Sequence, residues 1–145
     1  MDYKLKIDGI TDLDTTKAAL MGGCVKNIEI MTDTVEEYAK ERFNEPLFRF
    51  KIVFEINADT KAVAKDMMKW SLQRGTNEVY RNVQLTVLDN GGNKIRMIKI
   101  PNMFCEDYIE IYEELNDKSQ TKPHPYATLK LIQRGGETDK IANEV

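Results

Sequence analysis

The sequence predicts a mainly β fold: a β-sandwich or barrel of about seven antiparallel strands with one flanking α-helix. Three observations predict it. Apolar and polar residues alternate through residues 48–56, a glycine-rich turn at residues 89–93 joins two more strand-like runs, and residues 57–75 carry the clearest helical stripe. Strict alternation indicates strands with one buried and one solvated face, as in antiparallel sheets that cover a core on one side.

One domain, residues 1–145, accounts for the length, because a chain of this size buries about 68–70% of its unfolded surface. The net charge is −3 with both signs interspersed, which argues against a nucleic-acid-binding surface. No stretch approaches the roughly 18 apolar residues of a membrane span, and the first residues lack the apolar core of a signal peptide. We therefore expect a cytoplasmic protein, with Cys24 and Cys105 as free thiols.

Two strands are expected before residue 32. Residues 3–10 alternate in polarity and end in a turn, and residues 25–31 form a second run with Ile28 and Ile30 as its inward side chains. Residues 12–23 between them are ambiguous: their apolar side chains fit a short helix, but two successive glycines end any regular element there.

Residues 32–46 break the β pattern. The segment is charged, and its only large apolar side chains are Val35, Tyr38 and Phe43. It is either a solvated turn or an arm that leaves the domain and packs these three side chains on a neighbouring subunit, and the sequence leaves both open.

The next segment, residues 48–56, is the strongest strand prediction. Its inward positions are Phe48, Phe50, Ile52, Phe54 and Ile56, and its outward positions are Arg49, Lys51, Val53 and Glu55. A helix over residues 58–73 follows, with Asn57 and Asp59 as possible N-caps. Its stripe of Val63, Met67 and Trp70 recurs at i, i+4 and i+7, the spacing of a core-facing side.

Four strands are expected in the second half. A hairpin joins residues 83–88 to residues 95–100, and Pro101 is expected to end the second of these strands because it cannot donate to a ladder. Residues 108–113 alternate again, with Tyr108 and Tyr112 outward. After a loop at residues 116–125, Ala127, Leu129 and Leu131 mark the last strand, and the tail at residues 137–145 is expected to fray.

Catalytic and metal-binding motifs are missing from the sequence. The single histidine, His124, stands between two prolines, and Ser71 and Ser119 lack a nucleophile-elbow motif. A structural zinc needs four nitrogen or sulfur ligands, and only His124 and the two cysteines qualify. The acidic pairs at residues 106–107 and 113–114 fit either a cation site or solvated strand ends. We expect no catalytic, cofactor or metal site and no enzyme activity, with a His124–cysteine pair as the only enzymatic alternative.

Several features follow one another in a family-like order: a helix carrying Trp70, residues 83–89 with Gly91-Gly92 at the turn, Pro101-Asn102 at a strand exit, and residues 126–131 before Gly135-Gly136. With the opening run at residues 3–10, this order resembles the tube proteins of contractile injection machines. These include contractile phage tail tubes, R-type bacteriocin tubes and the haemolysin-coregulated protein (Hcp) of type VI secretion.

The resemblance implies a structural subunit of the inner tube. Such subunits form six-membered rings that stack into a hollow tube for DNA or protein, with sheath and baseplate or initiator proteins as partners and no cofactor. The residues facing the lumen would be Arg49, Lys51 and Glu55, or Gln84, Thr86, Arg96 and Lys99, and the sequence does not choose between these sets. The alternative function is a monomeric β-sandwich binding or adaptor module that uses Tyr108 and Tyr112.

Overall fold

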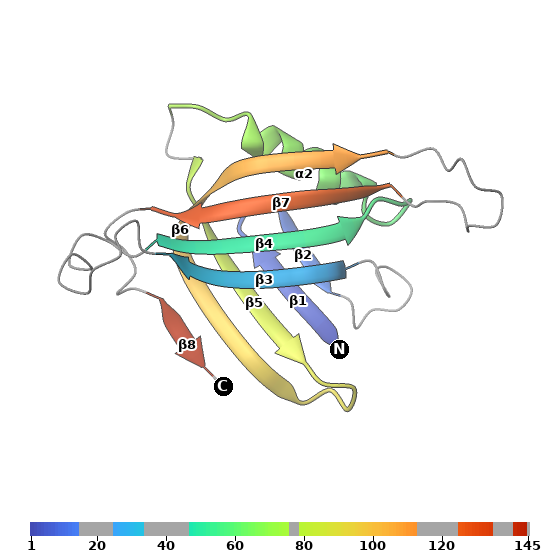
Figure 1. Ribbon diagram of the computed structural model, residues 1–145, viewed down its shortest axis with the longest axis vertical. Coiled ribbons are helices and arrows are strands. Elements are labelled where there is room, and N and C mark those ends of the chain that lie inside the picture. Colours follow the sequence, from blue (N-terminus) through green and yellow to red (C-terminus); the bar gives the residue numbers. More distant parts are fainter. Residues whose placement is uncertain (15–24, 34–46, 76–78, 113–124, 135–140, 145) are drawn as a thin grey trace.

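The computed structural model describes residues 1–14, 25–33, 47–75, 79–112, 125–134 and 141–144. These ranges contain eight strands and one helix, shown in Figure 1. Their bounds are β1 (Asp2–Ile7), β2 (Thr11–Asp14), β3 (Val25–Asp33), β4 (Leu47–Glu55), α2 (Lys61–Ser71), β5 (Arg81–Leu88), β6 (Lys94–Ile111), β7 (Tyr126–Gln133) and β8 (Ala142–Glu144). The mainly β prediction with one flanking helix is therefore confirmed.

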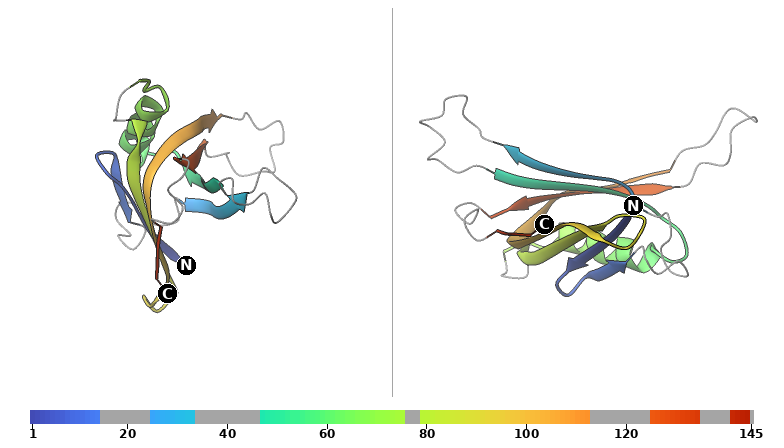
Figure 2. Two further views of the ribbon diagram at one scale, coloured as in Figure 1. Left: turned by 90° about the vertical axis from the view of Figure 1, so that its left-hand side faces the viewer. Right: turned by 90° about the horizontal axis from the view of Figure 1, so that it is seen from below.

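All eight strands belong to one antiparallel sheet, in the order β2-β1-β5-β6-β7-β4-β3, with β8 added to β6. The sheet folds over itself into two layers (Figure 2). We call β6-β7-β4-β3 the front layer, because it faces the viewer in Figure 1, and β2-β1-β5-β6 the back layer. Strand β6 belongs to both: its first half pairs with β5 and its second half with β7.

A bulge at Pro101 and Asn102 lets β6 serve both layers. Arg81 pairs with Met103 but Val83 pairs with Ile100, so two residues of β6 stand opposite one residue of β5. Asn102 has a φ of 53°, in the left-handed region that asparagine tolerates better than most residues. The expectation that Pro101 ends its strand is wrong, because a bulged position is left unpaired and no ladder bond is lost there.

Hydrogen bonds hold the bulge from both sides. The Asn102 N–H donates to Asn82 Oδ1 of β5 (3.2 Å), and the Asn102 carbonyl accepts from the Arg134 N–H just after β7 (2.8 Å). Gln133 Nε2 donates to the Pro101 carbonyl (3.3 Å). The bend is thus fixed by neighbours from both layers.

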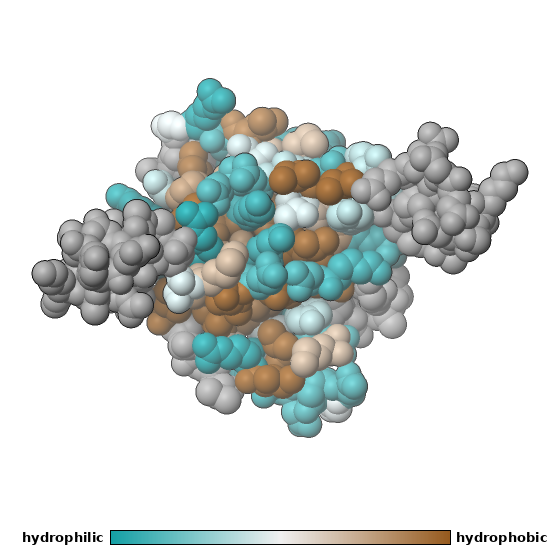
Figure 3. Space-filling view, in the orientation of Figure 1, coloured by the Kyte–Doolittle hydropathy of each residue, from teal (hydrophilic) through white to brown (hydrophobic). Residues whose placement is uncertain are grey.

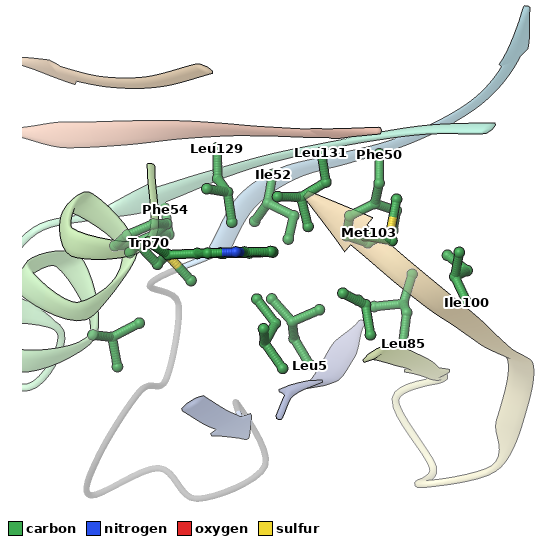
Figure 4. Packing of buried hydrophobic residues seen from close by; sticks show 14 of the residues in the cluster. Leu5, Phe50, Ile52, Phe54, Trp70, Leu85, Ile100, Met103, Leu129 and Leu131 are labelled. Carbon is green, nitrogen blue, oxygen red and sulfur yellow. The ribbon is translucent and has the colours of Figure 1, made fainter. Parts of the chain in front are cut away.

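The core fills the space between the layers, and α2 closes it from behind the front layer. Figure 4 shows the Trp70 ring lying between Leu5 and Leu85 of the back layer and Ile52 and Leu129 of the front layer. The predicted stripe of α2 is confirmed, since its residues are all buried. Trp70 Nε1 donates to the Val79 carbonyl (2.8 Å), so its one polar group is satisfied.

The segment before α2 is held by a small polar network. Asn57 Oδ1 accepts from the N–H groups of Asp59 (2.8 Å) and Thr60 (3.1 Å). The fully buried Thr60, which is the N-cap by its position, donates through its hydroxyl to the Glu55 carbonyl (2.6 Å). Asn57 therefore holds the turn into the helix, whereas Asp59 is exposed and its side chain makes no capping bond to α2.

The remaining predictions for strands, turns and the tail are partly confirmed. The inward alternation of residues 48–54 and the hairpin at residues 89–93 are confirmed, with Asp89 Oδ1 accepting from the N–H groups of Gly91 (2.9 Å) and Asn93 (2.8 Å). Ile30 is 39% exposed because β3 is an edge strand. The tail expected to fray contains β8, which pairs with β6. Most of residues 12–23 and 116–125 lies outside the described residues.

The core makes a direct prediction about stability. Replacing the fully buried Met67 by alanine should lower the free energy of unfolding by about 2–5 kcal/mol, since it leaves a cavity beside Trp70. Urea denaturation followed by the fluorescence of Trp70, the only tryptophan, measures this. The neighbouring Met68, 42% exposed, is the control, and Met68→Ala should change stability by less than about 0.5 kcal/mol. Equal losses in the two variants would contradict the described packing.

The bulge makes a second prediction. A β-branched residue at position 102 would have to adopt a left-handed backbone, so Asn102→Val should be less stable than Asn102→Gly by about 1–2 kcal/mol. Comparing these two variants removes the side-chain contacts of Asn102 from the difference. If valine proved as stable as glycine in the same urea titration, the left-handed conformation at Asn102 would be wrong.

Candidate functional site

The solvent-exposed side of the front layer, which we call the front face, is the largest grouping of the predicted site residues. The alternation of β4 places Arg49, Lys51 and Glu55 together on it, opposite the buried phenylalanines. In Figure 3 this face is mainly hydrophilic across its middle, with apolar side chains beside the charged ones. The structure therefore brings the first of the two predicted lumen sets together.

Charges on the front face are balanced and paired. Arg49 NH1 lies 3.1 Å from Glu106 Oε2, Lys51 Nζ lies 3.7 Å from Glu29 Oε2, and Lys26 Nζ lies 3.5 Å from Glu55 Oε2. Lys130 stands in register with Lys51 on one side and with Asp107 on the other. Four cations thus meet four anions: Lys26, Arg49, Lys51 and Lys130 against Glu29, Glu55, Glu106 and Asp107.

The charges of the front face lie at a partly solvated surface. Partly exposed ion pairs of this kind contribute about 0–1 kcal/mol each, so they add little to stability. A shallow depression of about 250 Å³ lies among Glu29, Arg49, Lys51, Glu106 and Lys130. The face therefore combines balanced charges with a few exposed apolar side chains, Met31 and Ile109 among them.

The second predicted set does not form one surface. Gln84 and Lys99 lie opposite each other on the exposed side of the back layer, beside a groove of about 360 Å³. Thr86 is buried. Grouping Arg96 with Lys99 is wrong, because residues three apart on a strand point to opposite faces and Arg96 shares the side of the buried Ile98.

The tyrosines assigned to the alternative binding module also differ from expectation. Tyr108 is half-buried against the core, whereas Tyr112 is 67% exposed. A shift in register between Cys105 and Asp107 turns Tyr108 inward. Both hydroxyls donate to Glu110, Tyr108 to Oε1 (2.6 Å) and Tyr112 to Oε2 (2.8 Å). Burial, with the bond to Glu110, raises the pKa of Tyr108.

Nucleophilic chemistry is disfavoured at Cys105. Burial, with Asp107 and Glu106 nearby, raises the pKa of its thiol to about 12. A reactive cysteine needs the opposite shift, because the thiolate is the nucleophile. Cys24 and His124, the other members of the enzymatic alternative, lie outside the described residues, as do the arm candidates Val35, Tyr38 and Phe43.

Within the described ranges, no group of three His, Cys, Asp or Glu residues is placed to hold a metal ion. No helix in that part of the chain has the length and apolar character needed to span a membrane.

Two open strand edges bound the front layer, and sequence reasoning missed them. β3 pairs only with β4 among the described strands, which leaves its other edge open. β5 pairs with β6 only as far as Met103, so residues 104–111 of β6 have no described partner strand on that side. Ile30 of the first edge and Ile109 of the second are 39% and 42% exposed. The unbroken run of strand residues through Pro101 could have indicated the second edge, but the sequence prediction ended that strand at Pro101.

Solved structures with the same arrangement span almost the whole chain. Hcp1 from Flavobacterium johnsoniae matches with a TM-score of 0.60 and 13% sequence identity, over 99% of this chain and 94% of that one. The fold is Hcp-like. No family model and no curated protein matches the sequence.

Other solved structures share this fold. Hcp1 from Salmonella typhimurium matches with a TM-score of 0.59 and 10% identity, over 90% of this chain and 79% of that one. The tube-terminating cap of the anti-feeding prophage matches with a TM-score of 0.56 and 9% identity, over 99% and 87%. At these identities the likeness establishes the fold, and it confirms the Hcp-like architecture expected from the order of elements.

The raised pKa of Cys105 makes a testable prediction. At pH 8 the folded protein should alkylate at Cys105 about 10³-fold more slowly than an ordinary thiol, because so little thiolate is present. Iodoacetamide labelling with peptide mass spectrometry separates Cys105 from Cys24. The same reaction in urea is the control and should restore the ordinary rate. Fast labelling of the folded protein would contradict the burial described for this thiol.

Proposed function

We propose that this chain is a structural, non-catalytic subunit of the inner tube of a contractile injection machine. The observation that carries the proposal is the front layer with its two open edges. Copies would join edge to edge into six-membered rings, and rings would stack into a hollow tube that passes DNA or protein. Sheath and baseplate or initiator proteins would be its partners, in a particle assembled from protein made in a bacterial cytoplasm.

The strand directions support edge-to-edge joining. Neighbouring strands in β6-β7-β4-β3 are antiparallel, so β3 and β6 run in opposite directions. β3 of one copy can therefore pair antiparallel with residues 104–111 of the next, and the alternation continues around a closed ring. Joining would also cover two edges that otherwise invite uncontrolled pairing.

Geometry favours the front face as the lumen lining. Four strands span only about 19 Å, since neighbouring strands lie about 4.8 Å apart. The back layer and α2 lie on the other side of the core (Figure 2). In a closed ring the outer circumference is larger than the inner one, so the back layer and α2 fit on the outside. Arg49, Lys51 and Glu55 would then face the lumen, and Lys99 would not.

Charges placed on either edge should prevent ring formation. An added charge on an edge strand opposes pairing with another strand, so Ile30→Lys and Ile109→Lys should each raise the concentration needed for rings at least tenfold. Size-exclusion chromatography with light scattering measures this, and negative-stain electron microscopy shows the particles. Leu72→Lys at the C-cap of α2, the matched control at an exposed apolar residue away from both edges, should assemble normally.

Three other results of the assembly experiments would contradict parts of the proposal. A strict monomer at high concentration would contradict the proposal and favour the binding or adaptor module. Single rings that never stack would contradict the tube-subunit role and favour a terminator, a role carried by one of the neighbours of similar fold. Normal rings from both edge variants would contradict edge-to-edge joining.

A further inference from the structure

The turn between β5 and β6 contains Asn90, the only asparagine of the chain that is followed by glycine. Asn90 and Gly91 are both exposed at the tip of this hairpin (Figure 1). Glycine has no Cβ, so no side chain shields the Gly91 nitrogen from the amide of Asn90. This pair is therefore the place in the chain where a backbone nitrogen most easily attacks a side-chain amide.

The reaction available to this pair is the loss of ammonia from Asn90. The Gly91 nitrogen attacks Cγ of Asn90 and closes a succinimide ring, while the bond from Cγ to Nδ2 breaks. The leaving nitrogen takes up the proton that the Gly91 nitrogen gives up, and it departs as ammonia. Water then opens the ring at either carbonyl carbon, which leaves aspartate or isoaspartate at position 90. The steps need no oxidant, metal or enzyme.

The attacking nitrogen is held by the residue before Asn90. Asp89 Oδ1 accepts from the N–H groups of Gly91 (2.9 Å) and Asn93 (2.8 Å), and Asp89 Oδ2 accepts from Asn93 Nδ2 (3.2 Å). The bonds from Asn93, with a smaller contribution from Gly91, lower the pKa of Asp89, so this carboxyl is ionised at neutral pH. The Asn90 side chain is held at its oxygen, which accepts from the Met1 amino group (2.9 Å), and not at the nitrogen that leaves.

A carboxylate in this position opposes the reaction. Attack requires the Gly91 nitrogen to lose its proton, and the negative charge forming there would lie 2.9 Å from a carboxylate oxygen. Neighbouring like charges disfavour ionisation. The charge-assisted hydrogen bond is also stronger than a bond between neutral groups, so it stabilises the protonated nitrogen and keeps the backbone in the turn.

We propose that Asn90 is a site of spontaneous deamidation, and that Asp89 restrains the reaction by holding the Gly91 N–H. Asn90 supplies the carbon that is attacked, Gly91 supplies the nucleophile, and Asp89 is the protecting residue. The product places a new carboxylate next to that of Asp89, and the isoaspartate form also adds a methylene to the main chain between β5 and β6. The proposal holds for a monomer as well as for a ring subunit.

Incubation of the purified protein at pH 8 tests the proposal. Peptide mass spectrometry detects the mass increase when an amide becomes a carboxylic acid, and chromatography separates isoaspartate from aspartate. Asp89→Ala should deamidate at Asn90 about tenfold faster than the unchanged protein, the change expected for one hydrogen bond to a charged group. Asn93→Ala is the matched control. It removes the contact with Asp89 Oδ2 but leaves the bond from Gly91, so its rate should change less than about twofold.

Two further measurements separate the folded turn from the local sequence. In urea the unchanged protein and Asp89→Ala should deamidate at the same rate, because the turn is lost in both. Asp89→Asn keeps a side-chain oxygen but removes the charge, so its folded rate should lie between those of the unchanged protein and Asp89→Ala. It also replaces Asp89→Ala if alanine disrupts the hairpin. Trp70 fluorescence checks that each variant is folded.

Three results would overturn the proposal. Equal rates in the folded unchanged protein, Asp89→Ala and Asp89→Asn would remove the protecting role of Asp89. An Asn90 that stays unmodified in urea while other asparagines react would remove the site itself. If Asp89→Ala accelerated the reaction by the same factor in urea as in the folded protein, the effect would belong to the neighbouring residue type and not to the hydrogen bond in the turn.

Discussion

The fold depends on one strand changing partners halfway along its length. β6 leaves β5 and joins β7 at Pro101 and Asn102, where the ladder shifts by one residue and the backbone enters the left-handed region. Without that bend, an 18-residue strand would extend a flat sheet and leave its apolar side in water. With it, the two halves of the sheet face each other and enclose a core that a single tryptophan spans.

Each side of the molecule carries a different kind of surface as a result. The front face is dense in charges that cancel in neighbouring pairs, so it has polarity without a net field. The helix on the other side of the core carries three exposed lysines, Lys61, Lys65 and Lys69. Because one layer of buried side chains separates these surfaces, each can change its exposed residues while the core keeps the same packing.

The sequence predicted those parts of the fold that local pattern determines. Alternation through β4 and the stripe of Val63, Met67 and Trp70 identified the core, because burial of one face imposes a period. The prediction failed at Pro101, because a proline ends a strand in an ordinary ladder but is tolerated at a bulge. For the site, the β4 set was predictable from alternation, whereas Arg96 and the open edges depend on long-range pairing that no local pattern encodes.

If copies join edge to edge as proposed, the even number of strands in the front layer restricts how this protein can change over evolution. Four alternating strands end in two edges of opposite direction. An insertion that added one strand would make the two edges run the same way, so neighbouring copies would meet in a parallel pairing. A complete hairpin would preserve the directions. In the proposed ring, growth of this layer would therefore be restricted to pairs of strands, while loops would remain free to vary in length.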